Sequence, residues 1–180
     1  MSESLPDTQH AINGLWELHL ASEFAHKDTE EALATMTSSP RVTIVPTMIG
    51  GHGRDEMRTF YSKHFLNQLP PDLEIVPISR TIGDSRVVDE LVLRFTHSIQ
   101  MDWVLPGIPA TNRRIELAMV VIVHVDGDRI ASENIYWDSA TILRQAGLLP
   151  DPTLPVLGAE SARNMIDPAP LNHLIHRASR

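Results

Sequence analysis

The chain of 180 residues contains no cysteine. This absence excludes disulfide bridges, a thiol nucleophile and a cysteine-based metal site, and it fits a reducing compartment. Lysine is also scarce, since Lys27 and Lys63 are the two that occur. The 23 Asp and Glu outnumber the 15 Lys and Arg, so the net charge is −8. Because no basic cluster offsets this charge, a nucleic acid is not expected as a partner.

A long hydrophobic run is missing as well. The longest apolar stretch, residues 117–125, is interrupted by His124 and is too short to cross a bilayer. The first ten residues are polar and acidic, unlike a secretory signal peptide. We therefore expect a cytoplasmic protein with no membrane partner. Its length and its 42% hydrophobic residues are enough for one domain with a sizeable core.

Several motifs of known chemistry are absent. No G-x-S-x-G elbow and no G-x-G-x-x-G turn occur, which disfavours a serine hydrolase and a dinucleotide enzyme. The nine His form no H-E-x-x-H motif, and we find no His–carboxylate cluster at ligand spacing. His173 and His176 are three residues apart but have no nearby acidic partner. The sequence therefore predicts no metal site.

Helical periodicity dominates the first part of the chain. It predicts a helix from residue 7 to about 26, a second over 29–36 and a third over 54–69. Asp28 is expected to cap the second helix, with Glu31 as its capping-box partner, and residues 37–40 are expected to end it. The Gly-Gly-His-Gly stretch at 50–53 is expected to form a turn.

Strands dominate the rest. β-Branched residues predict a strand, and a periodicity of two predicts four more, with Pro77 favouring an edge or a bulge. These strands are expected at 41–48, 73–82, 86–100, 114–125 and 129–137. Asp126-Gly127 predicts a hairpin between the last two. The pattern indicates an α+β fold in which helices pack on one face of a curved sheet and leave a pocket at its open end.

Asp138 is the leading candidate for chemistry. It lies between the last strand and a short helix that Gly147 closes. Asp138 shares a strand face with Tyr136, whereas Glu133 lies on the opposite face. One interpretation is a general acid/base in a partly apolar pocket, where desolvation raises its pKa. The other is a helix N-cap, and the two are compatible.

Other candidates have the same ambiguity. His97 shares its strand face with apolar residues, so it is either a core histidine or a catalytic base that faces the pocket. His124, on the neighbouring strand, has the same two interpretations. Tyr61, Trp103 and Tyr136 are candidate substrate-binding residues, although core packing is the commoner use of aromatic side chains.

Two adjacent carboxylates, Asp89 and Glu90, point to opposite faces of their strand, so they cannot form a dyad on one side. We expect Glu90 to form a structural ion pair with Arg94 or Arg80.

A family resemblance builds on these residues. The segments that carry it are the helix from Trp16 to Phe24, Phe60-Tyr61, Phe95-Thr96-His97, the loop 106–113, Asp126-Gly127, Tyr136-Trp137-Asp138 and residues 143–148. Over roughly residues 8–150 the chain resembles the SnoaL-like branch of the nuclear transport factor 2-like superfamily, which contains polyketide cyclases and ester cyclase-like proteins.

The resemblance implies a cone. A strongly curved antiparallel sheet would have the N-terminal helices over its concave face, and two chains would form a homodimer through the sheet. Residues 1–150 would form the SnoaL-like domain, and residues 151–180 an extension that packs on the domain or on a neighbouring subunit. Asp138 would act as general acid/base without cofactor or metal, assisted by His97 or His124.

Three functions follow for comparison. The first is a cofactor-independent enzyme of the lyase or isomerase type, which cyclises, isomerises or hydrates a small, mainly apolar, carbonyl-bearing molecule. The alternative is a non-catalytic small-molecule-binding or accessory domain of the same fold. A module whose sheet only mediates assembly is a third reading. Fold analogy alone does not separate them.

Overall fold

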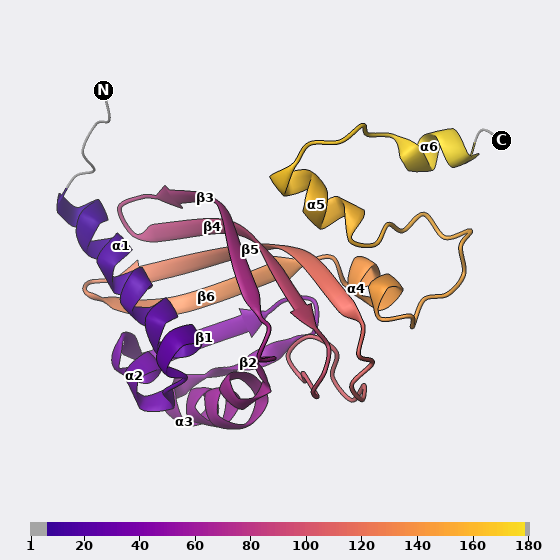
Figure 1. Cartoon of the computed structure of the whole chain (residues 1–180). Coiled ribbons are helices and arrows are strands. Elements are labelled where there is room, and N and C mark those ends of the chain that lie inside the picture. The colour runs from indigo at the N-terminus through magenta and orange to yellow at the C-terminus, as the bar shows by residue number, and fades with distance from the viewer. Residues whose placement is uncertain (1–6, 179–180) are drawn as a thin grey trace.

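Six strands form one curled sheet in the computed structural model, which describes residues 7–178 (Figure 1). In the order β2-β1-β6-β5-β4-β3, their bounds are β2 (Ile49–His52), β1 (Met36–Ile44), β6 (Arg129–Trp137), β5 (Arg114–Asp126), β4 (Arg86–Thr96) and β3 (Glu74–Ile82). All neighbours are antiparallel except β1 and β6, which run parallel. The expected antiparallel sheet thus contains one parallel pair.

The helices precede and interrupt the strands. The N-terminal ones are α1 (Asp7–Leu20), its π-helical continuation η1 (Ala21–His26), α2 (Thr29–Ala34), α3 (Gly53–Thr59), η2 (Phe60–Phe65) and η3 (Leu66–Gln68). The C-terminal ones are α4 (Ser139–Gln145), α5 (Glu160–Ile166) and α6 (His173–Ala178). Among the residues described, no helix has the length and apolar character needed to span a membrane.

The break between the first two helices is confirmed. Lys27 adopts a φ of 55°, and the Asp28 side chain accepts hydrogen bonds from the backbone N–H groups of Glu30 and Glu31. The capping box itself is wrong, because the carboxylate of Glu31 contacts His26 Nδ1 at 2.5 Å instead of the cap backbone. The Asp28 N–H donates to the carbonyl of Ser22.

Two predictions near β1 are also wrong. Residues 37–40 continue the strand instead of ending a helix, and the register shift between Met36 and Arg41 accommodates Pro40, which has no N–H to donate. The glycine stretch forms β2 rather than a turn, with Gly53 already in α3. Gly50, at a φ of 147°, comes so close to the carbonyl of Val42 that no Cβ fits there.

The remaining predicted strands are present in the sheet. β3 is an edge strand with a register shift after Pro77, which confirms both predictions for that proline. Asp126-Gly127 connects β5 and β6, and Gly127 supplies the positive φ of 60° that this tight hairpin needs. β4 ends at Thr96, four residues earlier than expected.

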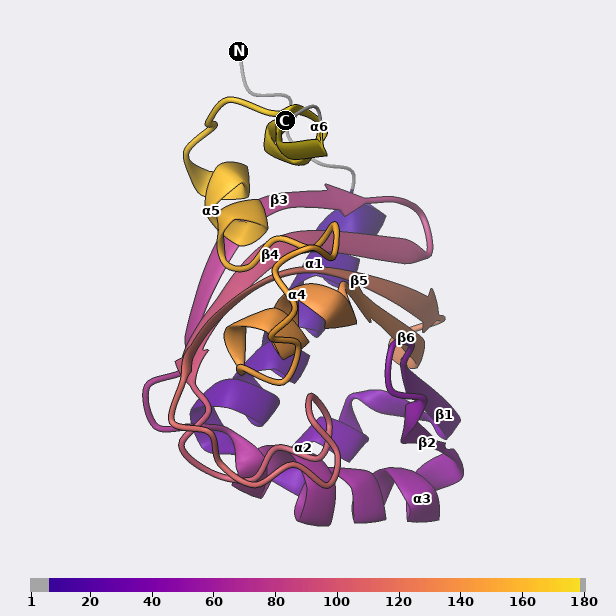
Figure 2. The ribbon, with the colours of Figure 1, turned by 90° about the vertical axis from the view of Figure 1, so that its right-hand side faces the viewer.

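The concave side of the sheet holds the core. α1 packs against β3, β4 and β6, and α3 packs against β1 and β2, so the sheet curls over the N-terminal helices (Figures 1 and 2). Alternate residues of the long strands point inward and are buried, as Val87, Leu93 and Phe95 are in β4. The predicted α+β cone is confirmed.

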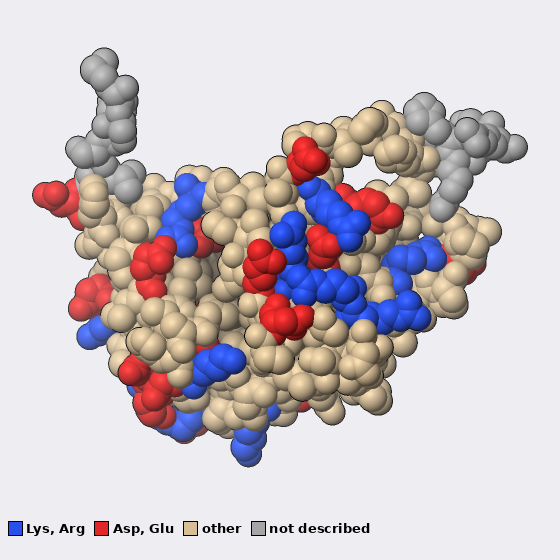
Figure 3. Space-filling model, in the orientation of Figure 1, with Lys and Arg blue, Asp and Glu red and all other residues tan. Residues whose placement is uncertain are grey.

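The convex side carries charged residues and the C-terminal extension. α5 packs on β5, and α5 and α6 lie away from the N-terminal helices in both ribbon views (Figures 1 and 2). Acidic and basic side chains gather over this part of the surface (Figure 3). The boundary near residue 150, and any contact of the extension with a second chain, stay predictions.

Candidate active site

A cavity of about 650 Å³ lies between the N-terminal helices and the inner face of the sheet. α1, η1 and η2 line one side, and strands β1 and β3–β6 line the other. Five aromatic side chains contribute to its wall: Trp16, Phe24, Phe60, Phe65 and Trp103. Its size and largely apolar lining suit a small organic molecule.

A buried polar cluster borders this cavity. His19 Nε2 lies 3.0 Å from Glu133 Oε1 and 3.2 Å from Glu23 Oε1. The three residues are 0%, 2% and 5% exposed, respectively, and both glutamates line the cavity. His19 and Glu23 are four residues apart and thus on one helical face, whereas Glu133 comes from β6.

Thr35 fixes the orientation of the His19 ring. Its hydroxyl donates to the carbonyl of Ala32 and lies 2.6 Å from His19 Nδ1. Since the hydroxyl hydrogen is used, Nδ1 must carry the hydrogen of the second bond. The other ring nitrogen, Nε2, faces the carboxylates of Glu133 and Glu23, and the Tyr61 hydroxyl lies 3.2 Å from it.

Electrostatics keeps His19 protonated. Burial alone lowers its pKa, but the charges of Glu133 and Glu23 outweigh this effect and raise the pKa to about 10. Burial raises the pKa of Glu133, and the attraction of His19 only partly offsets it. Burial and the two carboxylates raise the pKa of the Tyr61 phenol, which stays protonated. With both carboxylates ionised, the cluster carries one net negative charge.

A second polar group lies at the side of the cavity next to β3. Arg80 donates from Nε and Nη2 to the two oxygens of Asp89, each at 2.6 Å, and it also contacts Asn13 and Glu17 of α1. Trp16 Nε1 donates to Asp89 Oδ2 at 2.7 Å. These bonds tie the edge strand to α1 and use the donors of Arg80.

The expected partners of Glu90 are therefore wrong. Arg80 pairs with Asp89, and Arg94 pairs with Glu116 and Glu74. Glu90 accepts a hydrogen bond from the hydroxyl of Ser79 across the β3–β4 ladder. The reason is the shift of register after Pro77, which sets Ser79 opposite Glu90 and Arg80 opposite Asp89.

Asp138 caps α4. Its Oδ1 accepts a hydrogen bond of 2.9 Å from the N–H of Ala140, and the residue is exposed. On β6 the residues that line the cavity are Glu133 and Ile135, whereas Tyr136, on the opposite face, is 43% exposed. Asp138 therefore lies outside the described lining of the cavity, and its role as an acid stays a prediction.

The other predicted residues are dispersed. His97 is buried, its Nδ1 lies 3.1 Å from the hydroxyl of Thr111, and burial lowers its pKa. His124 pairs with Ser132 on the convex face. Tyr61 is buried behind the cavity wall and contacts the His19 cluster, and Trp103 lines the cavity.

Sequence reasoning missed His19, Glu23 and Glu133. The signal that was available is the His-x-x-x-Glu spacing on one helix, but Glu133 is more than 100 residues away in the chain. One ligand atom from each residue lies within 4.8 Å of the others, so these side chains form a His–carboxylate cluster that the sequence analysis did not expect. A divalent cation there would have to displace the proton on Nε2, which opposes its binding.

The comparisons with known proteins settle the family. The family model of SnoaL-like polyketide cyclases matches residues 17–146. The chain belongs to this family. The SnoaL-like family includes cofactor-independent cyclases and isomerases. No curated protein matches the chain.

Solved structures agree on the fold of this SnoaL-like chain. A protein from Jannaschia sp. CCS1 described as a SnoaL-like polyketide cyclase has a TM-score of 0.65 at 13% identity, covering 84% of this chain and 100% of its own. TsrD from Streptomyces laurentii has a TM-score of 0.62 at 18% identity, covering 81% and 100%. A protein from Kribbella flavida DSM 17836 described as a ketosteroid isomerase has a TM-score of 0.50 at 15% identity, covering 72% and 79%. At these identities the likeness concerns the fold alone.

Proposed function

We propose that this SnoaL-like protein is an enzyme that transfers protons on a small, mainly apolar, carbonyl-bearing molecule held in the cavity. The reaction class is isomerisation, cyclisation or hydration. The observation that carries the proposal is Glu133, a carboxylate only 2% exposed in the wall of a largely apolar cavity, with its pKa raised by burial. A raised pKa makes a carboxylate a better base at neutral pH.

The cluster has the parts that such a step needs. Glu133 would accept a proton from the carbon next to the carbonyl. It would return that proton to another carbon of the same molecule in an isomerisation, or to the alkoxide oxygen formed by ring closure in a cyclisation, whereas a hydration would also consume one water molecule. His19 would keep Glu133 in place through Nε2, while Thr35 holds the ring through Nδ1. Glu23 shares the charge of His19, which leaves Glu133 less fully neutralised than in a simple ion pair.

Hydrogen exchange tests the proposal without knowledge of the product. The purified protein is incubated in D2O with a panel of small apolar ketones and aldehydes, both neutral and amino-substituted, and the loss of the α-proton signal is followed by NMR. We expect Glu133→Gln to lower the exchange rate by about 10²–10⁴-fold, the usual contribution of a general base. Glu31→Gln, which removes an exposed carboxylate outside the cavity, serves as the matched control.

Two outcomes would overturn the assignment. Exchange that persists in Glu133→Gln but disappears in Asp138→Asn would return the role to Asp138. A chain that binds members of the panel yet exchanges none of their protons would be the non-catalytic binding domain.

A further inference from the structure

We infer that the cavity selects organic cations: its ligand is a small apolar molecule that carries a protonated or quaternary nitrogen. This inference deepens the proposed function, on which it rests, because it names the class of substrate. It follows from the charges and rings that face the cavity.

Carboxylates dominate the polar part of the lining. The acidic residues are Glu17, Glu23, Asp89, Glu90 and Glu133. Among the described residues that line the cavity, Arg80 is the single Lys or Arg. Its guanidinium is already bound by Asp89, Glu17 and Asn13, so it has little capacity left for an anionic ligand. A carboxylate or phosphate on the ligand would meet like charge in a medium of low dielectric constant.

Glu133 offers an oxygen without a proper donor. Its Oε1 lies 3.0 Å from His19 Nε2, but within the described chain it receives no hydrogen bond of acceptable geometry. The side chain is 3% exposed, and an unsatisfied buried oxygen of this kind is costly. An ammonium N–H in the cavity would satisfy it and neutralise the net negative charge of the cluster.

The aromatic wall suits the same ligand. Phe60 and Phe65 stack with centroids 5.4 Å apart, and Trp103 meets Phe65 edge-on at 5.2 Å. Ring faces attract cations within about 6 Å, most strongly where water is excluded. Aromatic rings beside carboxylates therefore favour a nitrogen cation with an apolar body.

The chemistry of the proposed reaction points the same way. Removal of a proton next to a carbonyl leaves a negative enolate, and the carboxylates of the cavity cannot stabilise it. Arg80 is occupied, and the positive charge of His19 is already paired with Glu23 and Glu133 outside the lining of the cavity, so a positive charge on the substrate would serve this purpose best. A substrate ammonium close to the reacting carbon would stabilise the developing anion and be recognised by Glu23 and Glu133.

Binding of unreactive probes tests this inference separately from turnover. Cyclohexylmethylammonium, cyclohexylmethanol and cyclohexanecarboxylate share one skeleton and differ in charge. Each is titrated into the full chain by calorimetry, with the fluorescence of Trp16 and Trp103 as a second readout. We expect the ammonium to bind at least tenfold more tightly than the alcohol, and the carboxylate to show no binding.

Variants locate the effect. Glu133→Gln is expected to weaken binding of the ammonium at least tenfold and to leave binding of the alcohol unchanged, which also shows that the variant is folded. Glu23→Gln is the second variant, in case the first does not fold, and Glu31→Gln is the control with unchanged affinity.

The inference fails if the alcohol binds as tightly as the ammonium, or if the carboxylate binds best. It also fails if equilibrium dialysis with Co²⁺ finds one ion per chain that is lost in Glu133→Gln, since the cluster would then be a metal site. Tight ammonium binding together with full α-proton exchange in Glu133→Gln would retain the inference and refute the proposed function. α-Proton exchange of neutral ketones, with no preference for cations in the binding titrations, would support the proposed function and refute the inference.

Discussion

Glu133 and His19 lie 3.0 Å apart, and both are almost completely buried, with Glu133 in the wall of the cavity. One comes from β6 and the other from α1, so the contact joins the sheet to the helix that crosses it. Glu23 is the second carboxylate of this arrangement, and the imidazole between them is positively charged over the whole physiological range of pH.

The stability of the fold should therefore decrease in alkali. The pKa of His19 rises from 6.5 to about 10 on folding, so its contribution is complete below pH 6.5 and is lost as the pH rises through about 10. Between these values the folded chain holds an additional proton at this site, so the free energy of unfolding should fall by on the order of 1 kcal/mol per pH unit. Urea unfolding from pH 6 to 10.5 measures it.

Glu23→Gln is the matched variant for this prediction. It removes one of the two carboxylates that raise the pKa of His19, so the loss of stability should end at a lower pH than in the unchanged chain. Identical pH profiles for the two proteins would contradict the charged state of His19.

Thr35 should be as important for stability as a core residue. Thr35→Val keeps the shape of the side chain but leaves the His19 Nδ1–H without an acceptor. An unsatisfied buried donor costs about 1–3 kcal/mol in the free energy of unfolding. Thr59→Val, which removes an exposed hydroxyl bonded to its own helix, should stay within about 0.5 kcal/mol. Equal losses in the two variants would disprove the orienting role of Thr35.

Asp138 can be tested in both of its roles. If Asp138 is an N-cap, Asp138→Ala should lower the free energy of unfolding of the protein by about 0.5–2 kcal/mol. Asp138→Asn should lower it much less, because Asn also caps helices. Since Asp138 lies outside the lining of the cavity, we expect α-proton exchange to persist in Asp138→Asn. Abolished exchange in a stably folded Asp138→Asn would support the assignment made from the sequence.

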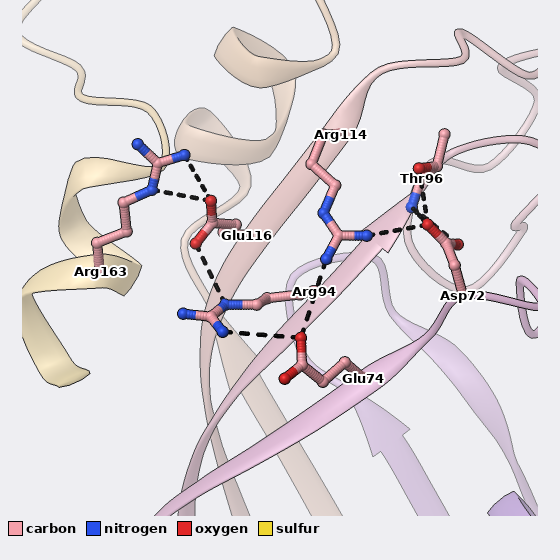
Figure 4. Close-up of polar contacts among 7 residues, drawn as sticks. All are labelled: Asp72, Glu74, Arg94, Thr96, Arg114, Glu116 and Arg163. Atoms are coloured by element: carbon pink, nitrogen blue, oxygen red, sulfur yellow. Dashed lines mark hydrogen bonds and ion pairs between the residues drawn. The ribbon is translucent and has the colours of Figure 1, made fainter.

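The C-terminal extension should be held by one buried carboxylate. Arg163 of α5 donates to Glu116 Oε1 at 2.5 Å, and Glu116 continues a chain of alternating charges through Arg94, Glu74 and Arg114 (Figure 4). Arg163→Gln should increase amide hydrogen exchange in α5. The unfolding midpoint of the domain should change little, because the Arg163 side chain is 63% exposed and Glu116 keeps its contact with Arg94.

Acidic pH should also increase amide hydrogen exchange in α5. Arg163 lowers the pKa of Glu116, so the stability from this contact is present above the ordinary carboxyl pKa and is lost as the pH falls through the lower folded value. Arg129→Gln, at an exposed contact with its neighbour Asp128, is the control for hydrogen exchange. Protection of α5 that is unchanged in Arg163→Gln would show that other contacts hold the extension.

The sequence by itself determined the class of fold and many of its local features. The cap at Asp28, the hairpin at Asp126-Gly127 and the edge position of Pro77 all depend on the conformations that these residue types favour within a few positions. The alternation along β6 also separated Glu133 from Tyr136 and Asp138, because strand side chains alternate between faces whatever they pack against.

Only the tertiary structure decided which of those two faces encloses the cavity. The curl of the sheet over α1 turns Glu133 inward and leaves Tyr136 exposed, and no periodicity within one strand contains that information. The tertiary structure also decided the conformation of Gly50. The local sequence favours a turn there, but the residue belongs to β2 and lies close to the backbone of Val42 in β1. His19, Glu23 and Glu133 become one cluster because folding closes more than 100 residues between the helix and β6. This arrangement alters two pKa values: burial raises the pKa of Glu133, and for His19 the charges of the two carboxylates outweigh the lowering effect of burial.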